Sequence, residues 1–241
     1  MKKVLLYSGG MDSWLIDKLW QPDIRMYVNM HTRYSDKEID KINKYGLNVS
    51  IIDFPLGQWE RDDAIIPLRN LYLLMVACNE TGDEDIEICY GATKGDRSKD
   101  QSLEFQEKAE DILNLLYSPQ SWIKEGKRIK VIHDYEKLTK SELLHSYLSM
   151  GGSLEEAFNN SLSCYNPDDN GCECWNCKPC FRKFVAFDCA GYSFSRQVID
   201  KNMAYCEYNI LPELKKGIYR CEEEDKDVRA SVNKHSHLLS G

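Results

Sequence analysis

The first 150 residues alternate between short apolar runs and segments with helical periodicity. Five runs have the composition of buried strands, at Val4–Tyr7, Ile24–Asn29, Val49–Phe54, Ile86–Tyr90 and Ile129–Ile132. Apolar residues at helical spacing predict five helices after these runs, at Asp12–Trp20, Ser35–Tyr45, Arg69–Glu80, Glu104–Tyr117 and Thr139–Met150. Such alternation predicts an α/β fold with a doubly wound parallel sheet. In these sheets, ligands bind beyond the carboxyl ends of the strands.

Length and charge narrow the classes of function. A chain of 241 residues can hold one α/β domain with an appendage. We therefore expect a sheet domain over residues 1–150 and a mainly helical region over residues 151–241. We recognise no signal peptide, and no run reaches the roughly 20 apolar residues that span a bilayer, so we expect a cytoplasmic protein without a membrane contact. The formal net charge of -8 disfavours a long non-specific contact with nucleic acid.

A glycine-rich turn follows the first predicted strand directly and reads Ser8-Gly9-Gly10-Met11-Asp12-Ser13. Glycine permits positive φ and a close approach of the backbone to a ligand. The N–H groups at the start of the following helix favour an anion. Ser8 and Ser13 can add hydroxyl donors, and Asp12 can help to hold a magnesium ion against the same phosphates. The turn therefore predicts a phosphate site, although it lacks the lysine of the Walker pattern.

Four of the ten cysteines form a Cys-x9-Cys-x2-Cys-x2-Cys array at Cys164, Cys174, Cys177 and Cys180. Thiolates at this spacing can close a tetrahedron around a structural zinc ion. An iron–sulfur cluster is the first alternative, but the ferredoxin pattern needs a further Cys-x3-Cys-Pro step. Unliganded thiols are the second, and they would be open to oxidation. Cys172 stays an alternative to Cys174 as a ligand. We expect the other five cysteines to be packing residues, namely Cys78, Cys89, Cys189, Cys206 and Cys221.

The glycine-rich turn resembles that of the PP-loop ATP pyrophosphatase superfamily, which reads Ser-Gly-Gly-x-Asp-Ser. Together with Ser163-Cys164-Tyr165 ahead of the cysteine triplet, and Arg182 and Lys183 behind it, it resembles the 7-cyano-7-deazaguanine synthase family of queuosine precursor synthesis. Further matching segments lie in the same order at Pro67–Asn70, Tyr90–Ala92, Asp100–Phe105 and Leu138–Glu142. The resemblance spans roughly residues 3–185 and implies a Rossmann-like fold of the adenine nucleotide alpha hydrolase type.

This resemblance implies an ATP-dependent ligase that releases AMP and pyrophosphate. Its acceptor would be 7-carboxy-7-deazaguanine or a close deazapurine acid, which ammonia converts to an amide and a nitrile. The family implies ATP, Mg²⁺ and structural zinc as cofactors, and commonly a homodimer. The implied nucleotide-binding residues are Ser8, Gly9, Gly10, Met11, Asp12, Ser13 and Gly91. The implied catalytic residues are Asp12, Arg33, Arg69 and Lys140, whereas Asn70 is expected to cap its helix.

Two segments depart from the pattern of the family. Ser102 stands where the family has an arginine, with Arg97 and Lys99 in the same loop, and the family's Gly-Gln-Arg-His reads His31-Thr32-Arg33-Tyr34 here. The acceptor acid, and the choice between amide and nitrile as product, therefore stay open. Two other functions also stay open: a PP-loop tRNA-modifying enzyme that thiolates or amidates, which the acidic charge disfavours, and a nucleotide-binding module that has lost catalysis.

Four local features are predicted to have structural roles only. Ser35 and Glu38 have the spacing of a capping box. The acidic run Glu222–Asp225 is predicted to be a solvated loop, and residues 229–241 a loosely held polar tail. In the third predicted helix, we expect the apolar face of Tyr72, Leu73, Met75 and Val76 to pack in the core.

Overall fold

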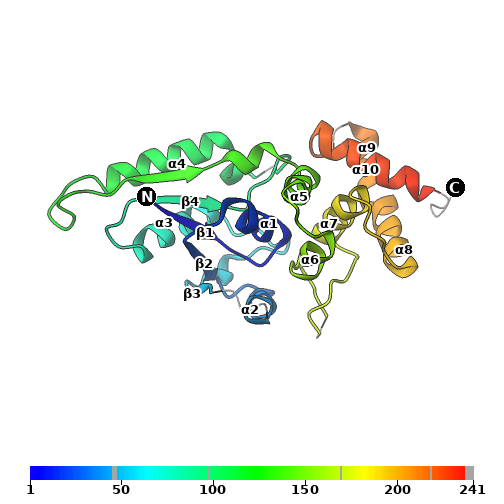
Figure 1. Cartoon of the computed structure of the whole chain (residues 1–241), viewed down its shortest axis with the longest axis horizontal. Coiled ribbons are helices and arrows are strands. Elements are labelled where there is room, and N and C mark those ends of the chain that lie inside the picture. Colours follow the sequence, from blue (N-terminus) through cyan, green and yellow to red (C-terminus); the bar gives the residue numbers. More distant parts are fainter. Residues whose placement is uncertain (45–47, 97, 169, 218, 237–241) are drawn as a thin grey trace.

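Five parallel strands form one sheet in the residues that the computed structural model describes, which are 1–44, 48–96, 98–168, 170–217 and 219–236. The strands are β1 (Lys2–Leu6), β2 (Ile24–Asn29), β3 (Ser50–Asp53), β4 (Ile86–Tyr90) and β5 (Ile129–Ile132). Their order is β3-β2-β1-β4-β5, and each neighbouring pair is parallel (Figure 1). The predicted fold class is confirmed. The point where the strand order reverses lies between β1 and β4, which is where ligands bind in such sheets.

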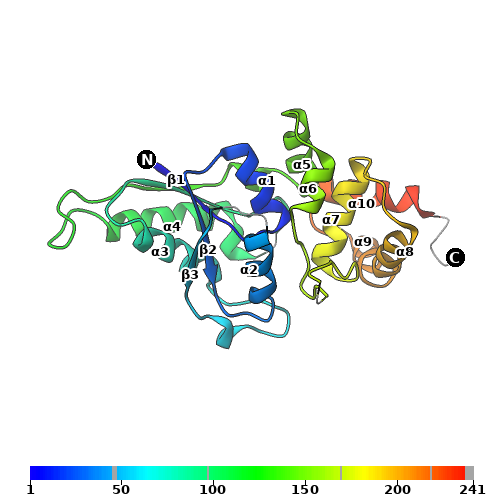
Figure 2. The ribbon, with the colours of Figure 1, turned by 60° about the horizontal axis from the view of Figure 1, so that its bottom comes forward.

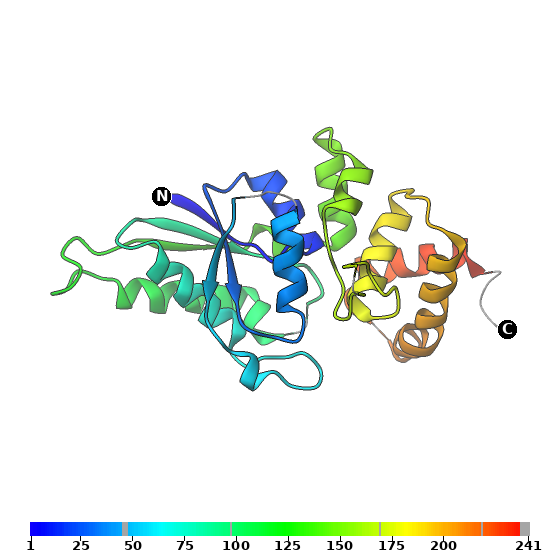
Figure 3. The same ribbon diagram turned by 90° about the horizontal axis from the view of Figure 1, so that it is seen from below.

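Helices cover both faces of this sheet, because the central strand is apolar on both of its sides. Val4 and Leu6 of β1 pack into the core beneath α3 and α4, whereas Leu5 packs beneath α1 and α2. Figures 2 and 3 show these two helix pairs on opposite sides of the strands. The four helices are α1 (Met11–Trp20), α2 (Ser35–Lys44), α3 (Arg69–Glu80) and α4 (Leu103–Leu116). Tyr45, the predicted end of α2, lies outside the described residues.

The remaining helices follow the last strand and form a second cluster, at the right of Figure 1. They are α5 (Lys140–Ser149), α6 (Leu154–Asn159), α7 (Lys178–Cys189), α8 (Arg196–Tyr205), α9 (Leu211–Lys216) and α10 (Glu222–Lys234). Helix α5 contacts both α1 and α7, so it joins this cluster to the sheet. Short helical turns lie at η1 (Gly57–Trp59), η2 (Lys99–Gln101), η3 (Asp134–Lys137) and η4 (Cys206–Ile210). In the described part of the chain, no helix is long and apolar enough to cross a membrane.

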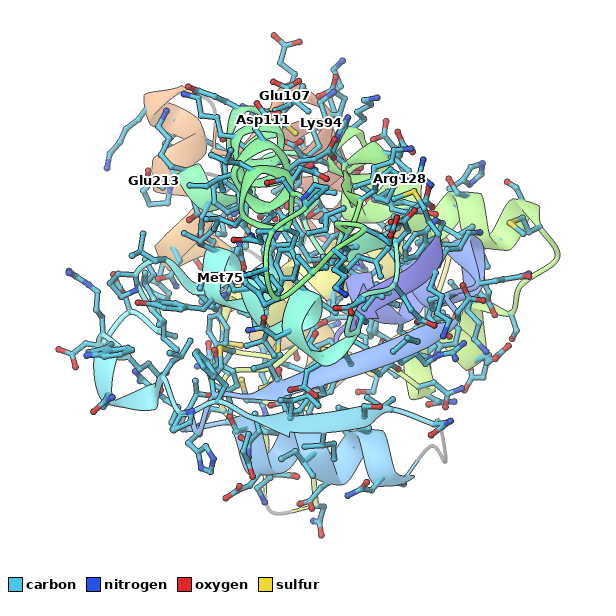
Figure 4. The ribbon with its side chains drawn as sticks, turned by 90° about the vertical axis from the view of Figure 1, so that its left-hand side faces the viewer. Met75, Lys94, Glu107, Asp111, Arg128 and Glu213 are labelled. Atoms are coloured by element: carbon cyan, nitrogen blue, oxygen red, sulfur yellow. The ribbon has the colours of Figure 1, made fainter. Side chains whose placement is uncertain are left out.

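The predicted apolar face of α3 is confirmed except at one residue. Val76 is buried, and Tyr72 and Leu73 pack partly against the core beneath α3. Met75 is 44% exposed, and Figure 4 shows it on the outer surface of the molecule, as it does Glu107 of α4. The prediction that Met75 packs in the core is therefore wrong.

The predicted capping box at Ser35 and Glu38 is wrong. The hydroxyl of Ser35 accepts a hydrogen bond from Thr32 N at 2.9 Å, so it closes the preceding turn instead. The Glu38 carboxylate accepts a hydrogen bond from the hydroxyl of Tyr27 at 2.8 Å. A true capping box begins α5, where Thr139 and Glu142 each bond the backbone N–H of the other.

Both predictions for the last twenty residues are also wrong over the part that the structure describes. The acidic run forms the first turn of α10, where Glu224 and Asp225 are buried. The Asp225 carboxylate accepts hydrogen bonds from the backbone N–H groups of residues 219 and 220, at 2.8 and 3.0 Å. Val232 and His235 are buried as well, so the predicted tail is packed as far as residue 235. Residues 237–241 lie outside the described residues.

Candidate active site and metal centre

The Ser8–Ser13 turn, named the phosphate turn here after its predicted ligand, follows the carboxyl end of β1, beside the point where the strand order reverses. Gly9 has a φ of 71°, a conformation that glycine adopts without strain. Gly10 is the N-cap of α1 and supplies no side-chain cap to the first N–H groups of the helix. The Ser13 hydroxyl is buried, accepts a hydrogen bond from Ser8 N at 3.2 Å and donates to Gly10 O at 3.1 Å. Ser13 therefore shapes the turn from inside.

The end of β4 lies against the same turn. A Cβ built at Gly91 would lie 3.4 Å from Asp12 Cβ and 3.7 Å from Ser13 N. Gly91 and the turn are therefore neighbours just beyond the carboxyl ends of the adjacent strands β4 and β1, which is the arrangement expected from the predicted nucleotide site.

Two of the predicted catalytic residues form an ion pair across 128 positions of sequence. Lys140 Nζ donates to both carboxylate oxygens of Asp12, and the two side chains are 9% and 18% exposed. Burial lowers the pKa of the Lys140 ammonium, and the Asp12 carboxylate opposes this change. The capping box at Thr139 fixes Lys140 as the first residue of α5. A carboxylate and an ammonium group thus lie together beside the phosphate turn.

Arg33 is held elsewhere. Its guanidinium donates to the Glu60 carboxylate at 2.8 Å and to the carbonyl of Arg61 at 2.7 Å, and its side chain is 49% exposed. Among the described contacts, those of Arg33 tie the loop after β2 to the loop after β3. The structure does not bring Arg33 into contact with Asp12.

Arg69 begins α3 and lies near two stacked tyrosines that the sequence prediction did not include. The rings of Tyr34 and Tyr165 have centroids 6.0 Å apart and an angle of 30° between their planes. Burial raises the pKa of Tyr34 to about 12, and Arg69 opposes the increase. Burial also raises the pKa of Tyr165, and the charges of Arg69 and Arg182 oppose it. Tyr165 is 47% exposed, so part of this tyrosine is accessible to solvent within the influence of the Arg69 charge.

Asn70 does not cap α3, because Leu68 is the N-cap residue. Asn70 is buried, and its amide donates to the carbonyl of Asp100 at 2.9 Å, while its backbone N–H donates to the Asp100 carboxylate at 3.3 Å. Ser102 caps α4, since its hydroxyl accepts a hydrogen bond from Phe105 N at 3.2 Å. The loop before α4 is thus anchored without the arginine of the family pattern. Arg97, one of the two nearby cations, lies outside the described residues.

The four predicted metal ligands come together. One sulfur from each of Cys164, Cys174, Cys177 and Cys180 lies within 4.8 Å of the others, and the sulfurs of Cys174 and Cys180 are 3.9 Å apart. Zn–S bonds of about 2.3 Å in a tetrahedron require sulfurs roughly 3.8 Å apart, so the set fits one zinc ion. Cys172 is exposed and lies outside the set, which selects Cys174 as the ligand.

Backbone N–H donors and the closeness of the four thiols also favour a metal ion at this cluster. The sulfur of Cys164 accepts hydrogen bonds from the N–H groups of residues 166 and 174, both at 3.3 Å. Contacts with Cys164 and Cys177, and then burial, raise the pKa of the Cys180 thiol. A divalent cation would offset the repulsion among the thiolates. Of the cysteines predicted to pack, Cys78, Cys89 and Cys206 are buried and Cys221 is half-buried, but Cys189 is exposed.

A buried network of charged residues links the loop after β4 to the C-terminal helices. The sequence analysis did not predict this network. Arg182 donates to Asp96 at 3.2 Å and to Glu224 at 2.6 Å, and Arg220 pairs with the same two carboxylates. Burial acts to lower the pKa of Arg182, but the attraction of Asp96 and Glu224 raises it overall. Arg182 followed the cysteine triplet in sequence, yet its partners lie 86 and 42 positions away. No local pattern could have paired them.

We expect Arg182→Met to destabilise the protein by about 3 kcal/mol, because it leaves two buried carboxylates with one arginine. The matched control is Arg196→Met, which breaks an exposed arginine–aspartate pair within α8 and should cost no more than about 0.5 kcal/mol. Urea unfolding of both variants gives the two free energies. Equal losses would show that the buried network contributes no more than a surface pair.

Known proteins resemble this chain in sequence. A family model described as "Queuosine biosynthesis protein QueC" matches residues 50–191, more than half of the chain. Two relatives named 7-cyano-7-deazaguanine synthase come from Pseudoalteromonas translucida (25% identical) and from a Nitratiruptor species (26% identical). A third, from Colwellia psychrerythraea, is named 7-cyano-7-deazaguanine synthase 1 and is 24% identical. The matches cover 78–79% of this chain and 94–96% of the relatives. The chain therefore belongs to the QueC family of queuosine biosynthesis proteins.

Proposed function

We propose that this protein is a 7-cyano-7-deazaguanine synthase, an ATP-dependent carbon–nitrogen ligase. The observation that carries the proposal is the Asp12–Lys140 ion pair beside an uncapped helix N-terminus, at the strand reversal of a QueC-family sheet. An anion is favoured at that helix start. The names of the relatives supply the product class.

In this proposal, residues 1–150 bind ATP and residues 151–241 carry the zinc site. The backbone N–H groups of Gly9, Asp12 and Ser13 face the β- and γ-phosphates, with Gly91 beside them. Asp12 holds Mg²⁺, which neutralises phosphate charge when it is bound. Zinc is structural, because four thiolates leave no coordination position for a substrate.

The acceptor acid would lie near Arg69 and Tyr165. The exposed ring of Tyr165 can stack on a flat heterocycle, and the guanidinium of Arg69 can hold a carboxylate. Lys140 would release Asp12 in part and turn toward the α-phosphate, where negative charge grows in the transition state. Arg33 keeps the loop after β2 in place through Glu60.

The reaction then has four bond exchanges. A carboxylate oxygen attacks the α-phosphorus of ATP, and pyrophosphate leaves. Ammonia attacks the carbonyl carbon, AMP leaves with the former carboxylate oxygen, and the product is the amide after loss of a proton. The amide oxygen attacks a second ATP in the same way. Loss of AMP and two N–H protons gives the nitrile. The protein supplies orientation and charge stabilisation for these steps.

Product analysis tests the proposal. Purified protein is incubated with 7-carboxy-7-deazaguanine, ammonium, Mg²⁺ and ATP, and the nucleotides and deazapurines are separated by chromatography with mass detection. We expect two AMP and two pyrophosphate per nitrile formed. Formation of ADP and phosphate would contradict the proposal. ATP binding without turnover on any deazapurine acid would favour a module that has lost catalysis.

A further inference from the structure

The segment that leads into the cysteine cluster, residues 161–164 (the cysteine loop), is hydrogen-bonded directly to the phosphate turn. Leu162 N donates to Gly9 O at 2.9 Å, and Met11 N donates to the hydroxyl of Ser163 at 3.3 Å. Ser163 is followed at once by Cys164, one of the four clustered sulfurs. A residue that bonds the turn and a residue of the metal centre are therefore consecutive in sequence.

A buried lysine holds the same segment from the other side. Lys183 is the third residue after Cys180 in α7, and its side chain is 1% exposed. Its ammonium donates to the carbonyl of Ser161 at 2.8 Å and to the carboxylate of Glu173 at 3.1 Å. Glu173 in turn accepts a hydrogen bond from Ser163 N at 2.7 Å. The segment at 161–163 is thus fixed by α7, which begins within the cysteine cluster.

We propose that Ser163 is a positioning residue for the nucleotide, held in place by the Lys183–Glu173 pair and by the cysteine cluster. Leu162 N–H draws the Gly9 carbonyl toward itself, which keeps a negative oxygen away from the phosphates. The hydroxyl of Ser163 fixes the N–H of Met11, the first residue of a helix that has no side-chain cap. A preformed turn loses less conformational freedom when a ligand binds. This inference depends on the proposed function only in taking ATP as the ligand of the turn.

The chain offers a matched set of variants for a test. Ser163→Ala removes the hydroxyl at the turn, and Ser163→Thr keeps it. Ser161→Ala is the control, because the hydroxyl of Ser161 lies in the same segment, and is more deeply buried than Ser163, but bonds only Ala157 O, at 2.8 Å, among the described contacts. All four proteins, wild type included, are loaded with zinc and compared for zinc content and melting temperature.

Three measurements follow on the zinc-loaded proteins. Amide hydrogen exchange should be faster at residues 9–13 in Ser163→Ala, and unchanged in Ser161→Ala and Ser163→Thr. Calorimetric titration with ATP and Mg²⁺ should give a Kd about three- to tenfold higher for Ser163→Ala alone, as expected for one lost hydrogen bond. In turnover, KM for ATP should rise by the same factor while kcat changes less than about twofold.

Equal exchange at residues 9–13 in Ser163→Ala and wild type would overturn the inference, whatever the ligand of the turn. Equal ATP affinity in Ser163→Ala, Ser161→Ala and wild type would overturn it as well. Failure of the wild type itself to bind ATP would instead contradict the proposed function. In that case the exchange experiment still decides whether Ser163 positions the turn.

Discussion

Replacing Asp12 with asparagine is expected to lower pyrophosphate release at least about a hundredfold. Asparagine keeps the shape of the side chain but loses the charge that pairs with Lys140 and that can help to hold Mg²⁺. Charge stabilisation of a transferring phosphoryl group is worth several kcal/mol, which corresponds to a factor of about 10² or more in rate. Initial rates of pyrophosphate release at saturating ATP and acid measure the effect.

Asp23→Asn is the control for this substitution. Asp23 precedes β2 at the opposite end of the sheet, where its carboxylate accepts a hydrogen bond from Lys3 N at 2.8 Å. Its loss should change the rate less than about twofold. Similar rates for Asp12→Asn and Asp23→Asn would show that the Asp12–Lys140 pair is part of the scaffold and has no part in the chemistry.

Removal of the metal is the second large effect. Closed thiolate sites contribute folding free energy directly. Here the cysteine cluster lies at the start of α7, and Ser163, next to the ligand Cys164, is hydrogen-bonded to the phosphate turn. We expect zinc removal to cost at least about 5 kcal/mol. For a chain of this size, that loss lowers the melting temperature by about 10–20 °C. Calorimetry before and after chelation, with the metal content assayed, gives the result.

Two substitutions separate the metal from general damage by the chelator. Cys177→Ser removes a ligand and should reproduce the loss of stability. Cys172→Ser changes an exposed cysteine outside the cluster and should keep one zinc ion per chain and the melting temperature of the wild type. An unchanged melting temperature in metal-free protein would show that the cluster is not a structural zinc site.

The sheet could be predicted from sequence because buried parallel strands read as continuous apolar runs. The predicted bounds of β2, β4 and β5 coincide with those in the structure. One error arose where a polar segment is paired with residues far away in sequence. The acidic run at 222–225 resembled a solvated loop, but Arg182 and Arg220 neutralise Glu224 inside the protein. Periodicity does not encode such long-range pairing.

The candidate site likewise has parts that sequence could predict and parts that it could not. The residues of the phosphate turn are close in sequence, and so are the four cysteines. The spacing within each group therefore predicts its ligand, phosphate for the turn and a metal ion for the cysteines, and the structure brings the four sulfurs together. Asp12 and Lys140 form an ion pair although 128 positions separate them in sequence. Tyr34 lies beside Tyr165 only because the cysteine loop folds back toward the end of β2. A resemblance could point to Lys140, but no spacing rule could have found the tyrosine pair.

The claim that the phosphate turn serves to adenylylate a carboxylate is tested most directly by oxygen tracing. Wild-type protein is given ATP, Mg²⁺, ammonium and 7-carboxy-7-deazaguanine with ¹⁸O in both carboxylate positions, and the AMP is examined by mass spectrometry. The account predicts one ¹⁸O atom in each AMP released, because the carboxylate oxygen leaves with the phosphorus that it attacked. Product formation with unlabelled AMP would contradict it.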